Sequence, residues 1–510
     1  MHATARPASS EAGLSFSGVA LLAALLAFAP LIKGGNRPLP LIILESAAVV
    51  LLCLLLIRPH FGNQFPRTLL LALTVLVVLP LIQLIPIPMS LWEYLPGRRY
   101  YAEAMSGVGV TQDFRVASLL RNVTEAAWLT LLVPIAVFLA TLATNQQRLK
   151  YLVNLFIGLA LLQAIIGLAQ FGTGSLSVLW PDPGARFASV SANGTYANSN
   201  HLAGLLEMAL PVVLGLLIAH LQLGGGKKFR PIQQSSIRQR ISRLFSSGIR
   251  FNLVALYATA GLGILLGIVF SRSRTGIALA MLGILLSALV FGSRVGGKRS
   301  SRIITVFMVI GSALVLEIGL APVLARFSSQ GASDPYRWSV YTSTLQGIRE
   351  FFPLGSGFGT YPTVFRRFQP GDVPEFVNHA HNDYLEWLFE GGLPAALLML
   401  VFLALYLLRW RQIWPREDYW LPYDFKRISA GIALLLMGLH GLIDFNLHIP
   451  ANAVFFAFLA GVFFHPEAPA RQVPGTPPKK VPVIAKPEPP PVTVAKPQPA
   501  DDQVRNPFAD

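Results

Sequence analysis

Repeated apolar runs, each long enough to cross a lipid bilayer, constrain this chain more than any other feature. A membrane-spanning helix needs about 20 mostly apolar residues. The sequence contains twelve such runs, near residues 16–33, 39–57, 68–87, 124–144, 151–171, 201–223, 252–270, 275–292, 303–320, 383–408, 428–446 and 450–465. Only 13% of the residues are charged, against roughly a quarter in a soluble domain. The sequence therefore predicts an all-α, polytopic membrane protein with about twelve transmembrane helices.

The first apolar run needs a separate decision, because a short apolar run near an N-terminus can be a cleaved signal peptide. Here the run from Phe16 to Ile32 is long, lacks a clear cleavage site and is followed almost at once by a second run. We interpret it as a membrane helix after a short N-terminus at 1–15. Residues 16–465 then form the transmembrane domain, with a long loop at about 321–382 that we expect to contain short helices.

The C-terminal residues 466–510 differ in composition from the rest of the chain. They are rich in Pro and Lys and poor in large apolar side chains, so they cannot bury enough surface to offset the entropy of ordering. We predict a disordered tail, which could dock a protein partner or simply be solvated. The single cysteine, Cys53, lies within an apolar run and excludes an intrachain disulfide.

The distribution of Lys and Arg predicts the orientation in the membrane. If the N-terminus is cytoplasmic, the cytoplasmic connections carry most of the basic residues near helix ends, most densely at 224–251. The outer connections mix fewer basic residues with acidic ones. The positive-inside rule then predicts that both termini are cytoplasmic. The net charge of +16 is thereby explained by topology and by attraction to anionic membrane lipids, and nucleic-acid binding is not expected.

Polar clusters gather on the predicted outer side, just outside the ends of helices. One is the turn FSRSRTG at residues 270–276, where Arg272 and Arg274 could either reach lipid headgroups or bind an anion. Another is the segment that begins DPYRW, which contains Arg337 and has the spacing of an amphipathic surface helix over 337–348. The glycines of 355–359 permit a tight turn but do not form a phosphate-binding loop.

A third cluster, NHAHNDYLEWLFEGGL, begins at Asn378. His379 and His381 could be a metal pair, but no third ligand lies at a fixed spacing from them, so a metal is not expected. If a helix begins near Asn382, His381 lies beside the positive end of the helix dipole. That position favours a neutral imidazole, the form that a general base needs. A capping or interfacial histidine is the alternative interpretation.

A fourth cluster, HGLIDFNLH, ends one of the last apolar runs. His440, Asp444 and His448 recur every four residues and so are expected to share one helical face. Such groups are costly in a membrane helix, and they could line a site or tie helices together. The amides of SANGTYANSNH at 191–201 suit sugar hydroxyls, although a capped helix start at Asn200 explains them equally well.

In this order, the clusters resemble the O-antigen ligase and O-antigen polymerase superfamily of bacterial envelope enzymes. The resemblance covers most of the membrane region and is strongest from about 190 to 460. It rests on the segments NSNHLAGLLEMALP, SRSRTG, DPYRWSVYTSTLQGIREFFPLGSGFGTYPTVF, HNDYLEWLFEGGL and HGLIDFNLHIPANAVFFAFLAG.

The resemblance implies a glycosyltransferase of the bacterial inner membrane that needs no metal or other cofactor. It would pass a glycan from an undecaprenyl-diphosphate carrier to a hydroxyl of a glycan, lipid A core or other acceptor, in surface polysaccharide or lipopolysaccharide assembly. By matching position, Arg274 and Arg337 would bind the diphosphate and His381 would be the catalytic histidine. Weaker candidates for substrate contacts are Arg272, Asn382, His379, Asn200, His440 and Asp444.

Several alternatives stay open at this point. The family includes ligases, polymerases and transferases that glycosylate proteins, and the sequence does not separate them. A transporter or a flippase of lipid-linked oligosaccharides is the competing class. Transporters tend to place charged residues near the bilayer midplane and to show internal repeats. Here the polar groups lie at helix ends and no repeat is evident, which favours the enzyme.

Overall fold

The structure is a computed structural model that describes residues 13–58, 66–173, 191–225, 249–292, 309, 335–371, 373–415 and 420–466. The chain divides into two units, Met1–Pro466 and Glu467–Asp510. The second unit, which contains most of the expected tail, lies outside the described residues. So do the expected helix at 303–320, apart from residue 309, and the basic connection between 226 and 248.

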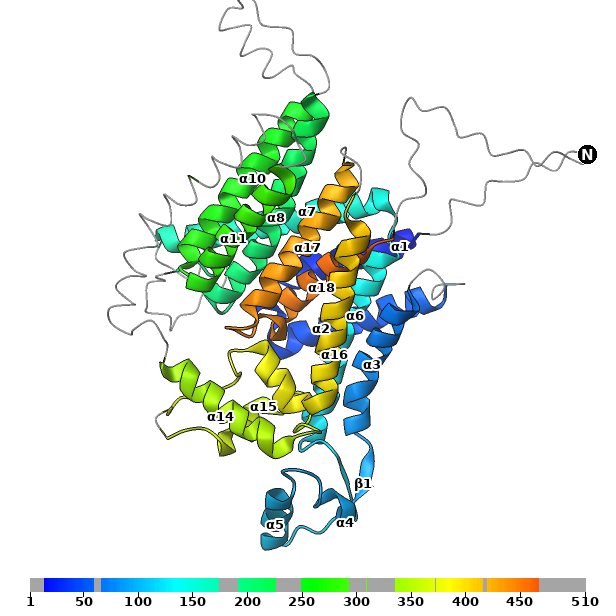
Figure 1. The fold of residues 1–510 in the computed structure, drawn as a ribbon, viewed down its shortest axis with the longest axis vertical. Coiled ribbons are helices and arrows are strands. Elements are labelled where there is room, and N and C mark those ends of the chain that lie inside the picture. The colour runs from blue at the N-terminus through cyan, green and yellow to red at the C-terminus, as the bar shows by residue number, and fades with distance from the viewer. Residues whose placement is uncertain are drawn as a thin grey trace, which may run out of the picture. The chain divides into compact units, whose positions relative to one another are not determined.

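The apolar runs in the described ranges form helices. Eleven helices correspond to eleven of the expected runs: α1 (Phe16–Phe28), α2 (Pro38–Leu56), α3 (Arg67–Gln83), α6 (Arg121–Leu142), α7 (Gln146–Thr173), α8 (Ser199–Gly225), α10 (Ile249–Ser271), α11 (Arg274–Gly292), α16 (Asp383–Ile413), α17 (Pro422–His440) and α18 (Pro450–Phe464). Within the described residues, seven of these are long and apolar enough to cross a bilayer, and α1, α3 and α18 are shorter apolar helices. The chain is an all-α, multi-pass membrane protein, and Figure 1 shows how its helices are arranged.

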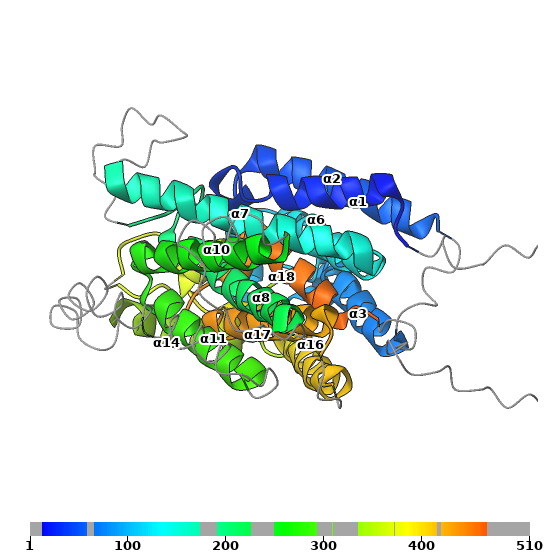
Figure 2. The ribbon, with the colours of Figure 1, turned by 90° about the horizontal axis from the view of Figure 1, so that it is seen from above.

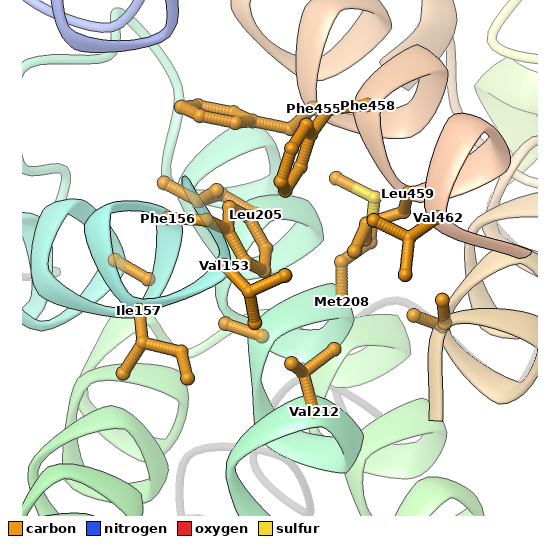
Figure 3. Packing of buried hydrophobic residues seen from close by; sticks show 14 of the residues in the cluster. Val153, Phe156, Ile157, Leu205, Met208, Val212, Phe455, Phe458, Leu459 and Val462 are labelled. Atoms are coloured by element: carbon orange, nitrogen blue, oxygen red, sulfur yellow. The ribbon is translucent and has the colours of Figure 1, made fainter. Parts of the chain in front are cut away.

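Helix α8 is the centre of the helix bundle. The apolar, membrane-spanning part of α8 is entirely buried inside the protein, whereas the corresponding parts of the other six candidate spanning helices are less than half buried. Its partners include α7, α10, α11, α17 and α18, which surround it in the view of Figure 2. Phe156 of α7 packs against Phe455 and Phe458 of α18, with ring centroids 5.4 and 6.0 Å apart, and Leu205 and Met208 of α8 join this cluster (Figure 3). Aliphatic and aromatic packing of this kind holds membrane helices together where lipid offers no hydrophobic gain.

Different chain segments meet at the two ends of the helix bundle. At one end, the Leu14 amide donates to the Ala143 carbonyl at 2.7 Å, and His465 bonds the Thr144 carbonyl at 2.6 Å. At the other end, the Asp383 amide donates to the Gly441 carbonyl at 2.8 Å. The start of α16 and the end of α17 therefore meet at this second end, where the polar clusters of the sequence also lie.

A layer of short elements covers the second end (Figure 1). Its members are β1 (Pro86–Pro88), α4 (Met89–Trp92), α5 (Arg99–Gly107), β2 (Phe114–Val116), α14 (Pro335–Phe351), α15 (Tyr361–Val364) and η5 (Phe365–Arg367). Two further short turns, η1 (Lys33–Gly35) and η6 (Asn446–His448), contact helices of the bundle. The strands pair antiparallel, with Pro86 opposite Val116. Phe351 and Tyr361 pack around Phe389 of α16 and give this layer a core of its own. The expected helix over 337–348 is part of α14.

The glycine-rich segment at 355–359 anchors this layer to α16. Gly355, Gly357 and Gly359 have φ angles of 77°, 118° and 77°, a region that side-chain-bearing residues rarely adopt. The Ser356 and Gly357 amides donate to the carbonyls of Phe389 and Glu390, at 2.9 and 3.0 Å. The glycines therefore allow direct backbone contact between a loop and a helix.

Replacing Gly355 with Ala is expected to lower the free energy of unfolding by roughly 2–4 kcal/mol, because it combines left-handed strain with a backbone clash. A Cβ at this position would lie 2.2 Å from the Glu390 carbonyl oxygen. Thermal unfolding in detergent measures the effect. Gly371→Ala is the matched control, because nothing lies within 4 Å of its Cβ position. Equal midpoints for the two variants would contradict the proposed anchoring.

Candidate functional site

His381 lies immediately before the first turn of α16. The Asn382 side chain caps this helix by accepting from the Tyr384 and Leu385 amides, both at 3.0 Å, so the expected helix start near Asn382 is confirmed. His381 has a φ angle of 50°, a strained conformation that is often found at functional sites. Its carbonyl accepts from the Tyr341 hydroxyl at 2.8 Å. The side chain is 22% exposed, which leaves the ring accessible.

Asp444 connects His381 to the start of α8. His381 Nδ1 lies 3.4 Å from Asp444 Oδ1, and Asn200 Nδ2 donates to Asp444 Oδ2 at 2.8 Å. Burial by itself would raise the pKa of Asp444, but the hydrogen bond from His381 and the nearby His201 hold it well below its usual range. Asp444 is therefore a buried carboxylate that orients the imidazole. The expected capped helix start is present but slightly earlier than Asn200: α8 begins at Ser199, and the Asn198 side chain accepts the Asn200 amide at 2.9 Å.

Arg337 reaches the same segment from α14. Its Nη1 donates to the Ile443 carbonyl at 2.9 Å, one residue before Asp444. The ring of Tyr336, also on α14, lies edge-on to His381 with centroids 6.4 Å apart. Two residues that the sequence singled out in separate segments, Arg337 and His381, are thus brought together around Asp444.

Arg272 and Arg274 lie at the start of α11, Arg272 two residues before the helix and Arg274 as its first residue. The guanidinium of Arg272, whose φ angle is 56°, lies 5.3 Å from the centroid of the Phe171 ring of α7. Arg274 is the first residue of α11. Two residues later, a Cβ on Gly276 would lie 2.5 Å from the Ala203 Cβ of α8. The first turns of α11 and α8 are therefore in direct contact, and Arg274 begins α11 beside the helix whose first turn holds Asn200.

Part of the chain matches a known protein family, and the matched part contains Arg274, Arg337 and His381. Residues 259–400 match the family model described as O-antigen ligase. The match supports membership of the O-antigen ligase and polymerase superfamily and a function of that type in polysaccharide assembly. A search of the curated proteins finds no match to this chain.

The part of the chain that matches the O-antigen ligase family contains Arg274, Arg337 and His381, but it omits Asn200 and Asp444. Those two residues enter the site only through the fold, because the hydrogen bonds around Asp444 join α8, α16 and the segment after α17.

The expectation that His440, Asp444 and His448 share one helical face is wrong. Helix α17 ends at His440, and His448 belongs to the separate 3-10 turn η6. Each residue has a different partner. His440 Nδ1 lies 2.9 Å from Glu207 of α8, and both side chains are fully buried. This pair ties two helices together, and Glu207 is a residue that the sequence analysis missed, although an acidic residue inside an apolar run is a signal in itself.

His379 belongs to a separate group of side chains, which we call the histidine–carboxylate cluster: His379, His448 and two carboxylates of α16, Asp383 and Glu386. His379 Nδ1 lies 2.8 Å from Glu386 Oε1, and His448 Nδ1 lies 2.7 Å from Asp383 Oδ1. Burial by itself would lower the pKa of His448, but Glu386 and Asp383 raise it to about 10. The Phe445 ring touches both clusters, stacked on His379 at 4.2 Å and edge-on to His381 at 5.0 Å. His379, Glu386 and His448 line a cavity of about 230 Å³.

For the glycan transfer proposed below, replacing Asp444 with Asn is expected to lower kcat about 10- to 100-fold, which corresponds to the loss of one charge-assisted hydrogen bond. The amide keeps the size of the side chain but not the charge that orients His381. The apparent KM for the donor should change little, because Asp444 would not touch it. Initial rates over a range of donor concentrations measure both constants, and an unchanged kcat would exclude a positioning role.

Proposed function

We propose that this chain is a glycosyltransferase of the bacterial inner membrane. It transfers a glycan from an undecaprenyl-diphosphate carrier to a hydroxyl of a growing glycan, lipid A core or other acceptor, at the periplasmic face. The carrying observation is the contact of His381 with the buried carboxylate of Asp444, one residue from the carbonyl that Arg337 bonds. Membership of the O-antigen ligase and polymerase superfamily supports the same reaction type.

His381 is the general base of this proposal. The ionised Asp444 accepts a hydrogen bond from the Nδ1–H group of His381, so the proton stays on Nδ1 and the lone pair of Nε2 faces the acceptor hydroxyl. As the acceptor oxygen forms its bond to the anomeric carbon, its proton passes to Nε2 and the bond from that carbon to the diphosphate oxygen breaks. Attack from the face opposite the leaving group inverts the anomeric configuration.

Arg274 and Arg337 bind the diphosphate in this proposal. A guanidinium offers two parallel N–H donors to phosphate oxygens, and it stabilises the negative charge that develops on the leaving group. Many soluble glycosyltransferases give this task to a divalent ion. With two arginines in place, the transfer step needs none.

A reconstituted reaction tests this function. The purified protein is incubated with a lipid-linked repeat unit, and the products are separated by size. Transfer of glycan from the carrier supports the proposal; a ladder of products indicates a polymerase, and a single addition to lipid A core indicates a ligase. Movement of the lipid-linked donor across vesicles without any transfer would instead indicate a flippase.

A further inference from the structure

The histidine–carboxylate cluster contains three side chains whose atoms could act as ligands of a metal ion. His379, Glu386 and His448 each offer one ligand atom, and these atoms all lie within 4.8 Å of one another. Glu386 Oε1 is central, at 2.8 Å from His379 Nδ1 and 3.3 Å from His448 Nε2. In a tetrahedral zinc site with bonds of about 2.0–2.1 Å, neighbouring ligand atoms are roughly 3.4 Å apart. Two of the three separations are therefore already close to those of a bound ion.

The outer contacts of the cluster orient these ligand atoms. Asp383 Oδ1 accepts from His448 Nδ1 at 2.7 Å, so His448 Nε2 faces Glu386. The Ala380 amide donates to Glu386 Oε2 at 2.8 Å, which leaves Oε1 for the cluster. A carboxylate behind a ligating histidine is the usual support of a zinc ligand. The cluster thus contains ligands and the groups that hold them.

The cavity supplies an accessible fourth position. His379, Glu386 and His448 all line the space of about 230 Å³, whose remaining wall is mostly apolar and includes Trp387 and Leu447. A water molecule is far smaller than this space. An ion held by the three side chains could therefore complete its coordination with a water or another small ligand from the cavity side.

We infer that His379, Glu386 and His448 form a binding site for one divalent transition-metal ion of the zinc class. Two imidazoles and one carboxylate suit zinc better than magnesium or calcium, which prefer oxygen ligands. On binding, the ion takes the place of the protons that His448 Nε2 and His379 Nδ1 share with Glu386. The His448 proton passes to water, and the His379 proton moves to the other ring nitrogen, Nε2, so that both ligand atoms have a free lone pair. The ion lies outside the proposed transfer step. It joins α16 and η6 to the segment just before His381, and so holds the loop that carries the general base.

The stoichiometry of bound zinc tests this inference. The protein is purified through a tag without histidines, stripped with a chelator, reloaded with zinc and dialysed, and its metal content is measured by mass spectrometry. We expect about one ion per chain in the wild type. His379→Ala, Glu386→Gln and His448→Ala should each lose it, and Asp383→Asn should bind about 10- to 100-fold more weakly. Failure of the wild type to retain zinc would overturn the inference.

Two control variants make the result specific. His220→Ala removes a histidine of α8 whose Nδ1 bonds the Leu216 carbonyl of its own helix, and it should keep the ion. His381→Ala should also keep the ion while losing transfer, so failure of the metal site and failure of the proposed function give different results. Retention of zinc by all three ligand variants would place the ion elsewhere and refute the site.

Discussion

Replacement of His381 by Ala is expected to lower kcat of glycan transfer by about 10²- to 10⁴-fold, the usual contribution of a positioned general base. Nδ1 of the imidazole lies 3.4 Å from Asp444 Oδ1, and Nε2 is the proposed acceptor of the proton of the attacking hydroxyl. Alanine has no group that can accept this proton. The KM for the lipid-linked donor should change little, because the two proposed diphosphate ligands, Arg274 and Arg337, are unchanged. Initial rates with purified protein in detergent measure both constants.

The matched control for this variant is His220→Ala, which removes a histidine that bonds a carbonyl of its own helix. Both proteins must reach the membrane in equal amounts. A wild-type rate for His381→Ala under these conditions would refute the assignment of the general base and leave only the coarser family assignment.

Replacement of Arg337 or Arg274 by Ala is expected to lower kcat by about 10²- to 10³-fold, as does the loss of one group that stabilises charge in a transition state. Unlike the histidine variant, these two should also raise the KM for the donor, because each removes a proposed phosphate contact. Lysine at either position should give an intermediate rate, since it keeps the charge but not the two parallel donors. The same rate measurements apply.

Arg366→Ala serves as the control for the arginine variants. Arg366 is exposed in η5, with its guanidinium 4.5 Å from the centroid of the Phe376 ring. The Arg366→Ala variant should transfer glycan at the wild-type rate. If it loses as much activity as Arg337→Ala, the effect reflects the surface charge of this layer and not binding of the diphosphate by particular arginines.

The helices could be predicted from the sequence because bilayer thickness imposes a length on every apolar run. The end of α17, in contrast, was predicted wrongly from the spacing of its polar residues. An apolar run with polar residues every four positions fits a helix through His448, yet the chain leaves the helix after His440. Contacts from other segments decide this: Asp383 accepts the Leu447 amide, and the Gly441 carbonyl accepts the Asp383 amide. A local pattern carries no record of such partners.

The site was predictable in its residue types and only partly in its geometry. Arg337 and His381 were singled out because ionisable groups at helix ends stand out against an apolar chain, and the roles predicted for them came from the family resemblance. The role of Asp444 as the partner of His381 depends on how α8, α16 and the segment after α17 meet. The third member of the His379 cluster, His448, lies in a different segment from His379 and Glu386, so no fixed spacing could reveal it.

The buried pair of Glu207 and His440 has a consequence for the biogenesis of this protein. The two residues are 233 positions apart in the chain, so a ribosome that has just delivered α8 to the membrane has not yet synthesised α17. A lone carboxylate in hydrocarbon is costly, and α8 would otherwise enter lipid without its counterpart. Glu207 therefore has to enter the membrane either as the neutral, protonated acid or beside the insertion machinery and neighbouring helices, and its partner becomes available only when α17 arrives.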